Sequence, residues 1–171
     1  DSQTKVSAIG EWADVIYDIL KSAQTTFVKD NNTGTSTTAI PAGWGNISSY
    51  DGHAYPGSGS YPAGQCTWYV YNRAKQLGIQ FDSFMGNGGD WFKKVGFSSS
   101  HTPKKHTAVS FVQGLAGSDP TYGHVAFCEE VRADGSFLIS EMNVYGVPAM
   151  TVSYRVLDSG TARQLWYVDG H

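Results

Sequence analysis

The period of the hydrophobic pattern changes along this chain, and that change restricts its fold more than any other feature. Before Thr107 apolar residues recur at helical spacing, as in CTWYVYNRAKQLG at 66–78, which ends in basic residues and a glycine as helices often do. From Thr107 on, apolar and polar residues alternate in short segments divided by turns: 107–113, 123–132, 136–144, 150–158 and 163–169. Helices followed by a run of strands indicate an α+β fold with a largely antiparallel sheet.

The length of 171 residues suits one domain with an appendage. Residues 10–29 carry apolar side chains at the spacing of an amphipathic helix, and residues 30–43 have the Asn, Thr, Gly and Ser content of a linker. We therefore expect an N-terminal amphipathic helix with its linker at 1–40 and a folded domain at 41–171.

Composition excludes several classes of partner. A net charge of -3, with 16% charged residues, provides no broad basic field, so we expect no nucleic-acid partner. No apolar run approaches the roughly 20 residues that span a bilayer, so we expect membrane attachment only through a segment upstream of Asp1. Few Lys and Arg beside abundant Ser, Thr, Gly, Asn and Tyr indicate an exported protein. The oligomeric state is left open.

Cys66 stands in YPAGQCTWYV, at the predicted start of a helix. Three interpretations are open: a nucleophile, one half of a disulfide with Cys128, or a small buried side chain. A helix N-terminus and a nearby histidine both stabilise a thiolate, which is the reactive form. A nucleophilic Cys66 therefore requires a histidine that the fold brings close to it.

Of the five histidines, His124 is the best candidate for a general base. It begins a predicted strand directly after a glycine, where its side chain can face a cleft. The next predicted strand carries Glu141 and Asn143, two residues apart and so on one face, and a hairpin at Asp134-Gly135 joins the two strands. Either side chain would then lie beside His124 and orient it.

A disulfide between Cys66 and Cys128 conflicts with this arrangement. Cys128 lies four residues after His124, which is roughly 13 Å along a strand at about 3.3 Å per residue. A Cys66 within hydrogen-bond reach of His124 is too far from Cys128 to pair with it. We therefore expect Cys128 to be a buried free thiol.

The order Gly-Gln-Cys, Gly-His-Val-Ala and Glu-x-Asn resembles the CHAP family, the cysteine, histidine-dependent amidohydrolases/peptidases that cut bacterial peptidoglycan. Four segments carry the resemblance, which extends from about Gly43 to Val168: YPAGQCTWYVYNRA, GNGGDWFKKV, GHVAFCEEV and GSFLISEMN. It implies a papain-like (NlpC/P60-like) fold, with N-terminal helices packed on a five- to six-stranded antiparallel sheet. The domain at 41–171 is then a CHAP-like catalytic domain.

The resemblance also implies roles for individual residues. Cys66 is expected to be the nucleophile, His124 the base and then the acid, and Glu141 the residue that orients the imidazole. Asn143 is expected to share that orienting role or to help bind the substrate carbonyl. The backbone N–H of Cys66 is the expected oxyanion donor. The further residues expected to bind the oxyanion or the substrate are Gln65, Tyr122 and Tyr145.

The chain departs from the family pattern in two places. Where the family usually has a glycine before the first long strand, this chain has His106 and Thr107, so we expect that strand to begin differently. Some phage members bind calcium upstream of the cysteine, but the corresponding segment here offers only Asp51 as an acidic ligand. We therefore expect no metal and no cofactor.

The expected function is hydrolysis of an amide bond in peptidoglycan, by an N-acetylmuramoyl-L-alanine amidase or by a stem or cross-bridge endopeptidase. A phage lysin, an autolysin and the wall-opening component of a Gram-positive conjugation or secretion machine all fit this activity. The expected location is extracellular or cell-wall-associated. Two alternatives stay open: a non-catalytic cell-wall-binding or assembly module on the same fold, and a cysteine protease that acts on protein.

Overall fold

The structure is a computed structural model that describes residues 34–171, which belong to one folded unit. The amphipathic helix predicted at 10–29 lies outside the described residues. Within the part of the chain that is described, no helix is both long and apolar enough to cross a membrane.

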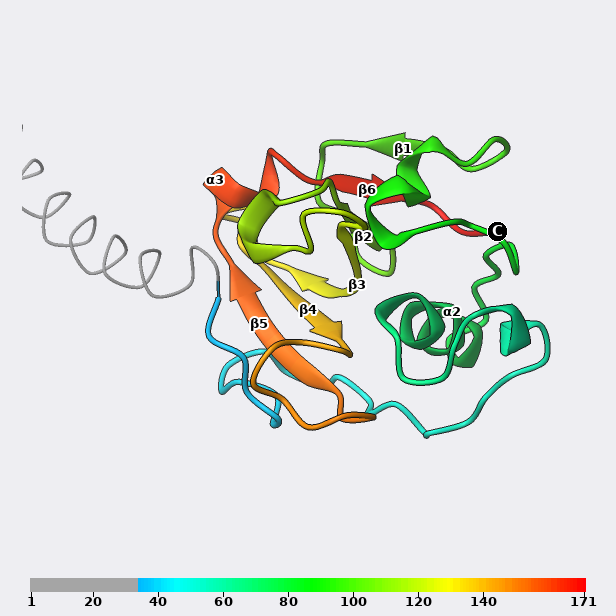
Figure 1. Cartoon of the computed structure of the whole chain (residues 1–171). Helices are drawn as coiled ribbons and strands as arrows, with labels where there is room; N and C mark the ends of the chain where they lie inside the picture. Colours follow the sequence, from blue (N-terminus) through cyan, green and yellow to red (C-terminus); the bar gives the residue numbers. More distant parts are fainter. Residues whose placement is uncertain (1–33) are drawn as a thin grey trace, which may run out of the picture. The chain divides into compact units, whose positions relative to one another are not determined.

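Short helices and six strands follow one another along the described chain (Figure 1). In order, they are η1 (Ser58–Ser60), α2 (Cys66–Gln76), η2 (Gly88–Lys93), β1 (Ser99–Ser100), β2 (Ala108–Phe111), η3 (Leu115–Gly117), β3 (His124–Val131), β4 (Phe137–Glu141), β5 (Ser153–Leu157), α3 (Ser159–Ala162) and β6 (Trp166–Val168).

The six strands form one antiparallel sheet in the order β1-β6-β2-β3-β4-β5. All five predicted strands are present, each shorter than its alternating segment, so the expected α+β class is confirmed. The sequence did not predict β1, because two serines at 99–100 carry no hydrophobic alternation. The predicted hairpin joins β3 to β4, and Gly135 in its turn has a φ of 88°, which a residue with a side chain rarely adopts.

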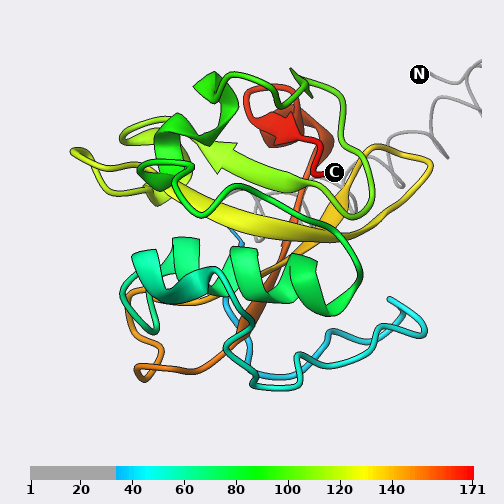
Figure 2. The ribbon, with the colours of Figure 1, turned by 90° about the vertical axis from the view of Figure 1, so that its right-hand side faces the viewer.

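The helix α2 lies along one face of the sheet, against β3 and β4 (Figure 2). Alternate strand residues such as Val125 and Phe127 join a core with Tyr69 and Val70 of this helix. The residues between them point to a second core on the other face, which includes Ala126, Cys128, Phe137, Ile139 and Leu157. Both faces of the central strands are therefore buried, which explains why their sequences are so apolar.

The segment before the expected boundary at residue 40 already belongs to this unit. The backbones of Thr37 and Tyr154 exchange two hydrogen bonds of 3.0 and 2.8 Å, so Thr37 extends the sheet beside β5. Ile40 packs on a small core that contains Trp44 and Leu138. The folded unit therefore begins earlier than the expected boundary, because backbone pairing can use polar residues that read as a linker.

His106, which stands where a glycine was expected, has a φ of 64° in the left-handed region. Its ring stacks on Phe127 with the centroids 5.8 Å apart. Both His106→Gly and His106→Ala lose this ring contact, but only alanine has a Cβ that disfavours the left-handed conformation. We expect the glycine variant to be more stable than the alanine variant by about 1 kcal/mol. Urea unfolding of the two variants tests this, and an alanine variant of equal or greater stability would contradict it.

Candidate active site

A cavity of about 940 Å³ lies where β3 begins and β4 ends. Six of the seven residues that the sequence proposed for the site line this cavity, and Glu141, the seventh, is fully buried beside it. The six are Gln65, Cys66, Tyr122, His124, Asn143 and Tyr145.

Cys66 is the first residue of α2, where the backbone N–H groups have no partner within the helix. Burial by itself would raise the pKa of the Cys66 thiol. The opposing effect is larger and comes from the charge of His124, a hydrogen bond with its ring, and hydrogen bonds with the backbone of Val125 and Thr67. The pKa of Cys66 is therefore lowered, which favours the thiolate.

His124 lies between the thiol and a carboxylate. Its Nε2 is 2.8 Å from Oε1 of Glu141, which leaves Nδ1 for Cys66. Burial opposes the charged imidazolium, but the charge of Cys66 and the hydrogen bonds with Cys66 and Glu141 outweigh it and raise the pKa of His124. The ring of Phe111 meets the imidazole edge to face, 5.3 Å away. Both shifts favour an imidazolium next to a thiolate.

Sequence reasoning missed Arg155, whose guanidinium holds Glu141 from the other side. Its Nε and Nη2 donate to the two carboxylate oxygens of Glu141 at 2.5 and 3.0 Å. Burial would raise the pKa of Glu141, but the charges of Arg155 and His124 outweigh it and lower the pKa. The available signal was an arginine in the apolar strand YRVL, because a buried guanidinium needs an anionic partner.

Asn143 does not take the position that strand alternation predicted. The strand β4 ends at Glu141, and Asn143 has a φ of 63°, so the two residues are not on consecutive pleats of one strand. The side chain of Asn143 is exposed and donates from Nδ2 to Oε1 of Gln65 at 3.1 Å. Asn143 thus contacts the residue before the nucleophile, whereas Glu141 contacts the histidine.

Both tyrosines proposed for the groove are exposed at its rim: Tyr122 has 58% of its surface accessible, and Tyr145 is fully exposed. A third aromatic residue on the rim, Phe84, was not predicted. Large exposed aromatic side chains around one cavity are typical of a binding surface.

Cys66 and Cys128 are both free thiols. The two sulfurs belong to different parts of the molecule, since Cys66 packs against the core beneath α2 and Cys128 lies in the core on the opposite face of the sheet. Burial raises the pKa of Cys128, so this thiol stays protonated. The disulfide interpretation is wrong, and the expectation of a buried free thiol at Cys128 is confirmed.

These shifts predict how catalysis by this pair would depend on pH. The pKa of a histidine is ordinarily 6.5 and that of a cysteine 9.0. Here the pKa of Cys66 is lowered and that of His124 is raised to about 9, so their order is reversed. The thiolate is lost as the pH falls through the lowered value, and the imidazolium is lost as it rises through the raised one. We expect a bell-shaped rate profile that falls above about pH 9. In Glu141→Gln the upper limb moves to lower pH, and an unmoved limb would contradict this assignment.

Known proteins match the region that contains this site. The CHAP domain family matches residues 56–143. An N-acetylmuramoyl-L-alanine amidase domain-containing protein of Staphylococcus aureus is 46% identical over 113 residues, which cover 64% of this chain and 18% of the relative. The staphylococcal secretory antigen SsaA of S. aureus is 37% identical over 135 residues, which cover 77% of this chain and 48% of the relative.

A solved structure is also similar. The crystal structure of an N-acetylmuramoyl-L-alanine amidase from S. aureus aligns with a TM-score of 0.62 and 44% sequence identity, over 66% of this chain and 32% of that one. With the six-stranded sheet, this match confirms the papain-like α+β fold. The chain spans less than half the length of each of these relatives.

Proposed function

Because this chain belongs to the CHAP domain family, we propose that it hydrolyses an amide bond of bacterial peptidoglycan with Cys66 as the nucleophile. One observation carries the proposal: Cys66, at the start of α2, meets a histidine that is held by a buried carboxylate, and both the thiol and the imidazole line the large cavity. The amidase names of two similar proteins support this substrate class.

In the first half of the reaction, the Cys66 thiolate attacks the amide carbonyl, and negative charge develops on the carbonyl oxygen. The backbone N–H of Cys66 is available to this oxyanion, since it belongs to the first turn of a helix. Gln65 adds a second donor, because its Oε1 accepts from Asn143 and its Nε2 is left for the substrate. The imidazolium of His124 then gives its proton to the leaving amine.

In the second half, water hydrolyses the thioester that joins the substrate acyl group to Cys66. Neutral His124 takes a proton from this water, which attacks the thioester carbonyl and releases the carboxylic acid with the Cys66 thiolate. Glu141 keeps the imidazole oriented through both halves, because it binds Nε2 and so leaves Nδ1 for the hydrogen bond with Cys66. The cycle ends with the thiolate and imidazolium restored.

The rim of the cavity suits a ligand with both sugar and peptide parts. Exposed Phe84, Tyr122 and Tyr145 offer apolar faces, while Gln65 and Asn143 offer amide groups. We place the site of action at the cell wall, outside the cell, in keeping with the secretory antigen among the relatives. An amidase and a stem or cross-bridge endopeptidase both remain within this proposal, as do the settings of a lysin, an autolysin and a wall-opening component.

Digestion of purified Gram-positive peptidoglycan tests the proposal, with mass spectrometry of the soluble fragments. The wild-type chain is expected to release muropeptides whose masses identify the bond that is cut. Cys66→Ala is expected to release none, and Cys128→Ala, which changes the other free thiol, retains the activity. If the wild type and Cys66→Ala both bind the wall but neither digests it, the non-catalytic wall-binding module replaces the hydrolase.

A further inference from the structure

We propose that Arg155 is a positioning residue of this site, the last member of a chain of alternating charges that runs Cys66, His124, Glu141, Arg155. The inference rests on the proposed function only for the identity of the reactive thiol. The positive charge of Arg155 balances the charge of the site and so stabilises the Cys66 thiolate, although the two residues are not in contact.

His124, Glu141 and Arg155 lie on one face of the sheet. Each is an even number of residues along its strand from side chains in the core on the face away from α2. These core residues are Ala126 and Cys128 in β3, Phe137 and Ile139 in β4, and Leu157 in β5. Glu141 has no exposed side-chain surface, and only 10% of the Arg155 side chain is exposed. The ring of Phe111 lies beside both His124 and Arg155, at 5.3 and 5.6 Å, and keeps this face apolar.

The first described residues of the folded unit, 34–37, pack against Arg155. At Gly34, with a φ of 74°, an added Cβ would lie 2.7 Å from Cδ of Arg155, so no larger residue fits without a shift. Gly34 and Ser36 line the same cavity as Arg155, and Thr37 pairs with β5 one residue before it. Residues that were predicted to be a linker therefore pack against Arg155 and hold it at the edge of the cavity.

The charges of these four side chains sum to zero, since they are a thiolate, an imidazolium, a carboxylate and a guanidinium. The other titratable residues that line the cavity are Tyr61, Tyr122, Tyr145 and Asp119. Asp119 forms hydrogen bonds within its own loop, where its Oδ1 accepts from the N–H groups of Thr121 and Tyr122. Phe111 of β2 and the segment 34–37 bring no titratable side chain to this face.

Charge balance explains why Arg155 affects a thiol that it does not touch. Without the guanidinium, the site at neutral pH holds two anions and one cation in buried surroundings. It regains neutrality by binding one proton, and Cys66 is the group that takes it, since Glu141 is held by His124. When Glu141 is neutralised as well, one anion and one cation remain, and the need for that proton disappears.

The rate of Cys66 alkylation by iodoacetamide, measured against pH, tests this inference without any wall substrate. Peptide mass spectrometry follows Cys66 separately from Cys128. In Arg155→Met we expect the acid limb of the profile to move up by at least about one pH unit, which lowers the rate on that limb about tenfold. In the double variant Arg155→Met/Glu141→Gln the limb returns toward the wild-type position. Arg163→Met, the same substitution at an exposed arginine, leaves the limb unmoved.

The double variant separates charge balance from a merely structural role. If Arg155 only supported the fold, the effects of the two substitutions would add. A double variant whose acid limb is shifted as far as that of Arg155→Met, or farther, therefore overturns the proposal. An acid limb that stays in place in folded Arg155→Met also overturns it. Circular dichroism checks the fold, and Arg155→Gln, which still donates to Glu141, carries the same test if the methionine variant does not fold. If the alkylation profiles of the variants shift as expected but the wild-type protein does not digest the wall, the proposed function is wrong and this inference still holds.

Discussion

His124→Ala is expected to lower the rate of wall hydrolysis by about 10³-fold while the protein stays folded. In the proposed mechanism, the imidazole gives a proton to the leaving amine and later takes one from water. Its loss also removes the cation that lowers the pKa of Cys66, so the thiol is protonated at neutral pH. Glu141 keeps its bidentate partner Arg155, so no buried carboxylate is left unpaired.

Release of soluble fragments from purified wall, together with thermal melting, measures this effect. His53→Ala is the matched control, because His53 is an exposed histidine that does not line the cavity. The control retains wild-type activity. A folded His124→Ala that keeps more than about a tenth of the activity would show that the imidazole does not carry the proton transfers.

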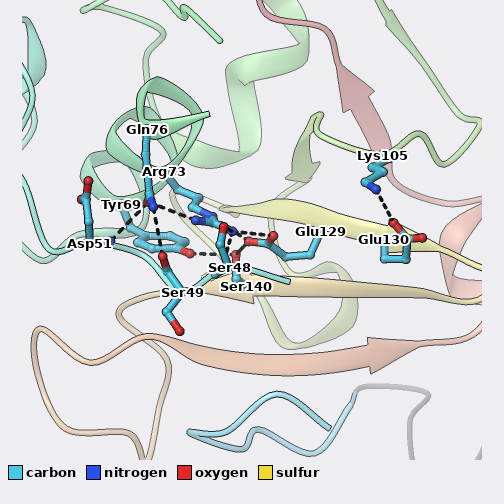
Figure 3. A network of polar contacts seen from close by, with 10 residues as sticks. All are labelled: Ser48, Ser49, Asp51, Tyr69, Arg73, Gln76, Lys105, Glu129, Glu130 and Ser140. Atoms are coloured by element: carbon cyan, nitrogen blue, oxygen red, sulfur yellow. Dashed lines mark hydrogen bonds and ion pairs between the residues drawn. The ribbon is translucent and has the colours of Figure 1, made fainter. Parts of the chain in front are cut away.

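Glu129→Gln is expected to destabilise the protein by about 3–5 kcal/mol. Arg73 of α2 and Glu129 of β3 form a buried bidentate pair, with Nε and Nη2 of the arginine each 2.9 Å from a carboxylate oxygen (Figure 3). Ser140 also donates to Glu129, at 2.6 Å, and receives a hydrogen bond from Tyr69. The substitution leaves a guanidinium buried between helix and sheet without its counter-ion, which costs far more than an exposed pair.

The neighbouring residue supplies the control for this second prediction. Glu130 pairs with Lys105 at 3.0 Å, with 37% and 56% of the two side chains exposed (Figure 3). Glu130→Gln is therefore expected to change the free energy of unfolding by about 1 kcal/mol or less. Urea unfolding of both variants gives the comparison. Equal effects at 129 and 130 would mean that the Arg73–Glu129 pair does not join α2 to the sheet as the geometry indicates.

Residues at the ends of elements were predictable from the sequence, because terminal positions leave local signals. Cys66 follows a turn at the start of an amphipathic helix, and His124 follows a glycine at the start of an alternating segment. The structure places both on one cavity, with Glu141 bonded to the histidine. Their roles in catalysis stay proposals until the variants are measured.

Features that depend on how strands pair were not predictable in the same way. Arg155 meets Glu141 across two neighbouring strands, and no local pattern states which strands are neighbours or in which register. Asn143 was misplaced because alternation was carried past Glu141, where the strand ends. The pairing of Thr37 with Tyr154 was missed because backbone hydrogen bonds leave no trace in side-chain composition.

Titration of wall hydrolysis by alkylation of Cys66 tests the central claim most directly. Samples with increasing fractions of Cys66 modified by iodoacetamide, as quantified by mass spectrometry, are assayed on purified peptidoglycan. The account predicts that the remaining activity equals the fraction of unmodified Cys66 and reaches zero at full modification. Hydrolysis that persists when Cys66 is fully alkylated would show that this thiol is not the nucleophile.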